Sequence, residues 1–145
     1  MRSGSRSGMT LLIDANILLD VLLDRQPHTH ASSIVWKLCE TGRVKGIVSA
    51  LSFADIVYIM RKSLDPERVE MLLDSLSLIF SFEDLHAADL QKAASMRWND
   101  FEDALQAVTA KRIHADRIVT RNTRDYAASP VPAVTPEELC EMMRD

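Results

Sequence analysis

Cysteine and glycine are both scarce in this chain of 145 residues, which has two cysteines and four glycines. Cys39 and Cys140 lie in unrelated segments without metal-ligand spacing, so we expect two reduced, buried thiols and no disulfide framework. The glycines form no phosphate-binding loop, and the sequence contains no Gly-x-Ser-x-Gly elbow. These absences exclude a disulfide scaffold, a P-loop nucleotide hydrolase and a serine hydrolase of the α/β type.

A long apolar run is also missing. The most apolar stretch, residues 11–23, is interrupted by Asp14, Asn16 and Asp20. It falls far short of the roughly 20 apolar residues that cross a membrane. No signal peptide is visible either. We therefore expect a soluble, cytoplasmic protein without a membrane partner.

The first eight residues, rich in serine, glycine and arginine, precede a second methionine at position 9. This pattern is typical of a vector-derived leader, which we expect to be disordered, and residues 9–145 are then expected to form a single domain. The net charge of the chain is −4, and exclusion of Arg2 and Arg6 changes it to −6. An acidic protein has no general attraction for nucleic acid. Any polyanion must therefore be held by bound metal and a local basic rim.

Short apolar segments alternate with amphipathic segments along the chain. The short segments predict strands at 11–14, 45–49, 78–82 and 117–120, and a short edge strand at 131–134 between prolines. The amphipathic segments predict helices at 16–23, 28–41, 50–63, from 66 onward, 86–96, 101–114 and after Thr135. Strands that alternate with helices predict an α/β fold with a parallel sheet covered on both faces.

Four aspartates lie at the ends of apolar segments. Asp14 closes the first predicted strand, and Asp125 trails the fourth. Asp55 follows the second strand, and Asp103 opens an apolar helical segment. The carboxyl ends of parallel strands converge on one edge of a sheet, where ligands usually bind. Because four acids there would repel one another unless a divalent cation held them together, the pattern indicates metal-assisted chemistry on a phosphate.

These acids could also have purely structural roles, as helix caps or as members of salt bridges, and not only a role as metal ligands. Asp14 is suited to be the N-cap of the helix that follows it, and Asp100 with Asp103 comes close to a capping-box pattern. Asp125 stands near two arginines and also fits an exposed salt-bridged loop. Capping explains one acid within 100–103 well but three acids poorly, because they repel one another. We therefore favour a ligand role for Asp103.

Three segments in this order resemble the PIN domain, a family of metal-dependent nucleases that includes VapC-type toxins. They are 12–16 (Leu-Ile-Asp-Ala-Asn), 101–105 (Phe-Glu-Asp-Ala-Leu) and 119–126 (Val-Thr-Arg-Asn-Thr-Arg-Asp-Tyr). The resemblance spans nearly all of residues 9–145. It implies a three-layer α/β/α sandwich with a central, mostly parallel sheet. It also implies an acidic pocket that binds Mg²⁺ or Mn²⁺ and cleaves RNA.

The resemblance also implies roles for the acids. Asp14, Asp103 and Asp125 take the family's acid positions as metal ligands and catalytic residues. Asp55 lies where the family usually has a glutamate in the helix after the second strand. Since aspartate is one methylene shorter, Asp55 either reaches the metal through water or remains a solvated helix residue. We count Asp55 as a catalytic candidate but not as a direct metal ligand.

Polar residues beside the acids complete the predicted site. Asn16, Thr120 and Asn122 are expected to orient the carboxylates or a metal-bound water. Arg121 and Arg124 are candidates for contact with the substrate phosphate. The predicted function is a metal-dependent ribonuclease, the toxin of a toxin–antitoxin pair, with RNA as substrate, an antitoxin as partner and a homodimer as its assembly.

Two alternatives remain at this stage. A receiver-like domain would also place acids at the carboxyl edge of a parallel sheet, but it needs an adjacent acid pair after the first strand, where this chain has only Asp14. The other alternative is a catalytically impaired PIN-like module that binds RNA, its pocket decayed at Asp55.

Overall fold

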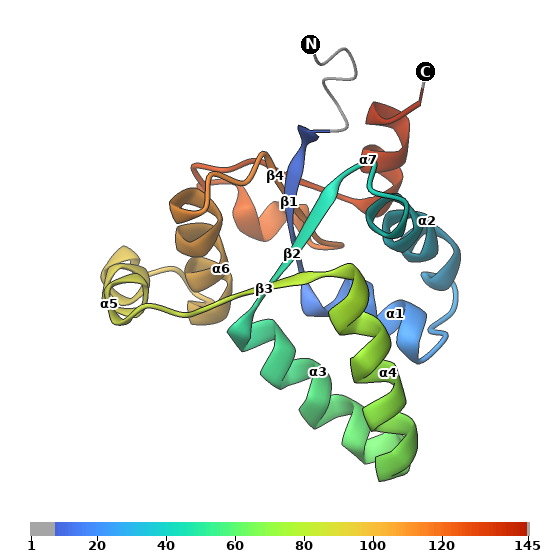
Figure 1. The fold of residues 1–145 in the computed structure, drawn as a ribbon. Helices are drawn as coiled ribbons and strands as arrows, with labels where there is room; N and C mark the ends of the chain where they lie inside the picture. The colour runs from blue at the N-terminus through green and yellow to red at the C-terminus, as the bar shows by residue number, and fades with distance from the viewer. Residues whose placement is uncertain (1–7, 145) are drawn as a thin grey trace.

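A five-stranded parallel sheet lies at the centre of the molecule, with helices on both faces (Figure 1). The computed structural model describes residues 8–144. The strands are β1 Thr10–Ile13, β2 Lys45–Ser49, β3 Ser81–Glu83, β4 Arg117–Val119 and β5 Ala133–Val134. Their order in the sheet is β3-β2-β1-β4-β5, and every neighbouring pair is parallel. The predicted three-layer α/β/α sandwich is confirmed.

Helices connect these strands, and four of them begin at a capping side chain. Their bounds are α1 Ala15–Leu22, α2 Thr29–Glu40, α3 Ala50–Ser63, α4 Pro66–Ile79, α5 Ala87–Met96, α6 Phe101–Arg112, the 3₁₀ helix η2 Thr123–Tyr126 and α7 Pro136–Met142. The side chains of Ser49, Asp65, Asp100 and Thr135 each accept a backbone N–H of the first turn that follows. Such caps satisfy N–H groups that have no partner inside the helix.

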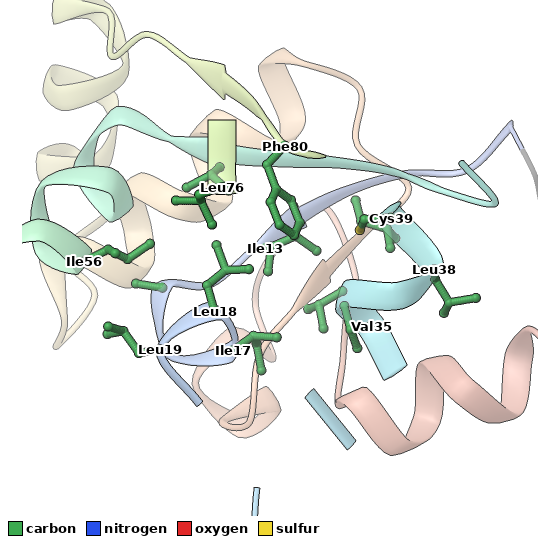
Figure 2. Packing of buried hydrophobic residues seen from close by; sticks show 14 of the residues in the cluster. Ile13, Ile17, Leu18, Leu19, Val35, Leu38, Cys39, Ile56, Leu76 and Phe80 are labelled. Carbon is green, nitrogen blue, oxygen red and sulfur yellow. The ribbon is translucent and has the colours of Figure 1, made fainter. Parts of the chain in front are cut away.

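Alternate side chains of β1 pack against the helical layers on opposite faces of the sheet. Leu11 and Ile13 are fully buried in the larger core, which also draws side chains from α1, α2, α3, α4 and α7. Figure 2 shows Ile13, Leu76 and Phe80 within this cluster. Leu12 points the other way and packs in a second cluster with residues of α6. This period of two is what a strand buried on both faces requires.

The predicted strand at 78–82 is wrong in its first half. Leu78 and Ile79 form the last turn of α4, and the Phe80 N–H still bonds to the Leu76 carbonyl oxygen at 3.0 Å. The strand starts only at Ser81. A short apolar run occurs in strands and at the ends of helices, so periodicity over a few residues does not separate the two. Helix α6 likewise ends at Arg112, before the predicted His114, whose φ is +58°.

Two smaller expectations have mixed outcomes. Cys39 and Cys140 are unpaired as predicted, and Cys39 is buried while Cys140 is partly buried. The expected leader at residues 1–8 lies outside the described residues except for Gly8. No helix in the described part of the chain has the length and apolar character needed to cross a membrane.

Gly46 in β2 leaves no room for a side chain. A Cβ at this position would lie 2.7 Å from Cys39 Sγ and 2.8 Å from Phe80 Cδ1. We expect Gly46→Ala to lower the free energy of unfolding by about 1–3 kcal/mol, because overpacking forces neighbours out of place. Urea denaturation measures the change. Gly8→Ala is the matched control, since nothing lies within 4 Å of its Cβ position; equal stabilities of the two variants would contradict the prediction.

Candidate active site at the carboxyl edge of the sheet

Asp14 stands where β1 turns into α1. Its backbone N–H donates to the Val119 carbonyl oxygen at 3.0 Å, which extends the pairing of β1 with β4. Asp14 occupies the N-cap position, yet its side chain makes no capping hydrogen bond. Instead, the Thr120 hydroxyl donates to Asp14 Oδ2 at 3.0 Å. The hydroxyl of Thr120, the residue after β4, is therefore the side-chain donor that fixes the carboxylate, beside the backbone of Ala15 and Asn16.

Asp103 reaches the same edge of the sheet from the first turn of α6. Asp100 is the cap of this helix, and its Oδ1 accepts the Asp103 N–H at 3.1 Å. Asp100 therefore serves as the helix cap, and the Asp103 carboxylate takes no part in capping. The buried Tyr126 hydroxyl donates to Asp103 Oδ1 at 3.1 Å. Tyr126 in η2 is a site residue that the sequence prediction missed.

The pKa values of Asp14, Asp103 and Tyr126 are all raised, and each of these groups is affected by its neighbours in the site. Burial raises the pKa of Asp103 to about 6, and the negative charges of neighbouring aspartates, Asp125 and Asp14 among them, act in the same direction. Burial also raises the pKa of Asp14, against the hydrogen bond from Thr120. Burial raises the pKa of the Tyr126 hydroxyl as well, and the charges of Asp14 and Asp103 add to this. Acids far apart in sequence therefore act on one another here.

A cleft of about 690 Å³ opens beside Asp103. Asp125 lines it from the exposed side of η2, and Arg97, Trp98 and Arg124 contribute to the same wall. The structure thus places Asp14, Asp103 and Asp125 in one region at the carboxyl edge of the sheet. Whether they perform the roles assigned to them stays a prediction.

Asp55 meets a partner that the sequence prediction did not assign. Its side chain lies on α3, six residues after the cap Ser49, and contacts Glu102 in the first turn of α6. Burial and the adjacent charge of Asp55 both raise the pKa of Glu102. The run of acids from 100 to 103 was the available signal for Glu102. Two helices therefore place a second pair of carboxylates near Asp103.

An ion pair with a buried carboxylate joins α1 to the turn after β4. Asp20 in α1 is fully buried, and Arg121 donates to both of its oxygens, each at 3.1 Å. The Ser32 hydroxyl donates to Asp20 Oδ2 at 2.9 Å, and an Arg25 nitrogen lies 3.9 Å from Oδ1. Arg121, predicted to contact the substrate phosphate, is already committed to Asp20. The sequence prediction missed Asp20 because it looks like one more residue of an amphipathic helix.

Of the polar residues predicted to orient the acids, the side chain of Thr120 contacts Asp14 and the side chain of Asn16 binds Arg25. Thr120 contacts the Asp14 carboxylate directly, and the backbone N–H of Asn122 donates to Thr120 Oγ1 at 3.2 Å. The Asn16 side-chain oxygen instead accepts a hydrogen bond from Arg25 at 3.0 Å, and only the Asn16 backbone contacts Asp14. The side-chain support of Asp14 therefore comes from Thr120, at the start of the turn after β4.

The donor chemistry of the site fits a hard divalent cation. Its ligands are carboxylate oxygens, which Mg²⁺ and Mn²⁺ prefer over sulfur or imidazole. Within residues 8–144, no group of three or more His, Cys, Asp or Glu side chains is arranged to hold an ion directly. Mg²⁺ often takes only one or two carboxylates and keeps several waters. Asp14 and Asp103 fit that pattern as a ligand pair, with water in the remaining positions.

Comparisons with known proteins agree with this architecture. The PIN domain profile matches residues 10–124. A toxin–antitoxin complex from Klebsiella pneumoniae superimposes with a TM-score of 0.68 at 21% identity, covering 87% of this chain and 97% of that chain. VapBC2 from Rickettsia felis, bound to a DNA fragment from its promoter, gives 0.67 at 18%, with coverages of 88% and 98%.

A third solved structure is VapC20 from Mycobacterium tuberculosis, a toxin that cleaves the sarcin-ricin loop. It superimposes with a TM-score of 0.67 at 10% identity and covers 81% of this chain and 94% of that chain. No protein with a curated description matches the sequence. At these identities the structural likeness demonstrates a shared fold.

Proposed function

Because the chain belongs to the PIN-domain family, a family of nucleases, we propose that it is a metal-dependent ribonuclease and the toxin of a toxin–antitoxin pair. The observation that carries this proposal is the meeting of Asp14 and Asp103 around Tyr126 at the carboxyl edge of the sheet. Toxin–antitoxin complexes among the structures of the same fold support the second part. The family membership also removes the receiver-like alternative.

Asp14 and Asp103 would hold the cation, with Asp125 acting directly or through water. The chemistry that a bound Mg²⁺ or Mn²⁺ supplies is a nucleophile formed from water at neutral pH and compensation of the charge that builds up on phosphorus. Attack on phosphorus breaks the bond to the 3′ oxygen of one nucleotide. The products are a 5′-phosphate and a 3′-hydroxyl.

The residues of the chain hold these acids in place. Thr120 fixes Asp14 by its hydroxyl, and Tyr126 fixes Asp103 in the same way. Tyr126 keeps its proton at neutral pH because burial and the two carboxylates raise its pKa, so it remains a hydrogen-bond donor. Partners of this kind set the orientation and basicity of metal ligands.

A catalytically impaired RNA-binding module is the second candidate. It is favoured by the absence, within the described residues, of three ligand side chains arranged around one point. The Asp55 side chain is also engaged with Glu102, a residue without an assigned role in catalysis. Both candidates share the fold and differ in whether a metal binds and RNA is cut.

A toxin also requires a partner that covers it. Tyr58, Met71 and Leu78 on α3 and α4 are exposed by 65%, 63% and 88%. Large exposed apolar side chains are typical of protein interfaces. We propose that such surfaces serve the antitoxin and a second copy of the chain.

The first test measures metal binding and RNA cleavage together. We expect MnCl₂ to raise the melting temperature, since a ligand at about 100 times its Kd adds about 2.7 kcal/mol to the free energy of unfolding. We expect the same protein to cut a fluorescent single-stranded RNA, and EDTA to stop the reaction. A protein that shows neither stabilisation nor cleavage would be the inert module. Stabilisation by MnCl₂ without cleavage would retain the metal site and reject the activity.

A further inference from the structure

Arg97 lies in the wall of the cleft that contains Asp103 and Asp125. We infer that Arg97, together with Arg124, binds the backbone phosphates of single-stranded RNA beside the cleavage site. This inference rests on the proposed function and adds a substrate-binding residue to it. Three observations carry it: the backbone of Arg97, the packing that anchors it, and the partners of the other arginines.

The backbone of Arg97 adopts the left-handed conformation. Its φ is +61° and its ψ is +33°, at the C-cap of α5. Glycine is the usual residue at such a helix end, because a Cβ is disfavoured in this conformation. The other non-glycine residues with positive φ in the described chain are Asp24 and His114, both of types that tolerate it better. An arginine held here against its preference points to a use for its side chain.

The turn that carries Arg97 is anchored to the acids. Its neighbour Trp98 packs edge-on against Tyr126, with ring centroids 6.2 Å apart and an interplanar angle of 77°. Tyr126 in turn donates its hydroxyl to Asp103. The position of Arg97 is therefore coupled through two contacts to the carboxylate that is proposed to hold the metal.

The charge of Arg97 is not used by the fold. Arg112 binds Glu83 and Asp89, and Arg121 binds Asp20. Within residues 8–144, by contrast, the guanidinium groups of Arg97 and Arg124 form no ion pair and no hydrogen bond, and both residues are exposed. In the same part of the chain the guanidinium groups of Arg61 and Arg68 are equally without a partner, but they lie on α3 and α4 and do not line the cleft. In a chain with a net charge of −4, a polyanion needs a local basic surface to approach an acidic site.

The cleft is thus lined by acids and by two arginines, which come from two separate segments, the α5–α6 turn and η2. Arginine can bind a phosphate through two parallel N–H donors. Such contacts position the strand without reading its bases. We therefore assign Arg97 to the backbone and not to sequence recognition.

The test measures RNA binding in a background that does not cleave. The parent is Asp14→Asn, which leaves Asp103, Tyr126 and Trp98 unchanged. A fluorescein-labelled oligouridylate reports binding by anisotropy at several salt concentrations, for the parent and for added Arg97→Gly or Arg97→Lys. Arg61→Gln is the matched control, because this exposed arginine lies in the last turn of α3. Cleavage by wild-type protein is measured separately, so that loss of the proposed function is recognised by itself.

We expect Arg97→Gly to raise the Kd about threefold to tenfold and to reduce the slope of log K against log salt by about 0.7. Its melting temperature should stay at or above that of the parent, because glycine relieves the backbone conformation. Arg97→Lys should keep the salt slope, and Arg61→Gln should leave the Kd unchanged. Equal affinity and slope for parent and Arg97→Gly would overturn the inference, as would an equal loss in the Arg61→Gln control.

Discussion

An Asp103→Asn variant is expected to lose metal-dependent RNA cleavage by about 100-fold or more, because changes even to residues that only support a metal ligand cost about 10–100-fold. Asparagine has the same shape and keeps an oxygen for the Tyr126 hydroxyl, which donates to Asp103 Oδ1. What it removes is the negative charge that attracts a cation. Initial rates at saturating MnCl₂ measure the loss.

The fold of this variant should survive. Asp103 lies among other acids whose charges oppose its ionisation, so removal of its charge relieves repulsion in metal-free buffer. We expect a melting temperature at or above that of wild type, and loss of the MnCl₂-induced stabilisation. Asp74→Asn is the matched control, since Asp74 is an exposed acid on α4.

Two results would contradict this assignment. Full activity of purified Asp103→Asn would remove Asp103 from the site. An equal loss in Asp74→Asn would show that the assay responds to net charge and not to the pocket. Asp14→Asn provides an independent second variant, because Asp14 is held by a different partner, Thr120.

Asp20→Ala is expected to lower the free energy of unfolding by about 3–5 kcal/mol, the usual result when one member of a buried ion pair is removed. Asp20 is fully buried and receives two hydrogen bonds from Arg121 and one from Ser32. Its loss would leave the Arg121 guanidinium and the Ser32 hydroxyl without their acceptor. The pair also joins α1 to the turn after β4, so that turn should lose order as well.

Urea denaturation of single and double variants measures this effect. Arg121→Ala should be less costly than Asp20→Ala, because the Arg121 side chain is 30% exposed whereas that of Asp20 is 0% exposed. The double variant should be more stable than the sum of the two losses implies, since neither partner then remains alone. Asp74→Ala is the control for loss of an acid in a helix. A loss below about 1 kcal/mol for Asp20→Ala would mean that the pair is no stronger than an exposed one.

Several elements of the fold follow from local sequence with little error. The predicted limits of β2 and α3 coincide with the structure, because each has a clear period and Ser49 caps the helix. The prediction failed at 78–82, where the apolar residues Leu78 and Ile79 belong to the last turn of α4 and Leu78 is exposed. A short apolar run therefore does not by itself distinguish a strand from the end of a helix.

The sequence alone determined the α/β class, the order of its elements, and the positions of Asp14 after a strand, Asp103 in a first helical turn and Asp125 in a polar turn, because these depend on hydrophobic period and capping over a few residues. Only the tertiary structure decided which groups meet. Arg121 binds Asp20 of α1 because β4 pairs with β1. Tyr126 binds Asp103 because η2 packs against α6. Such contacts join residues far apart in the chain, and no local pattern specifies them. Their geometry exists only once the strands have paired and the helices have packed on them.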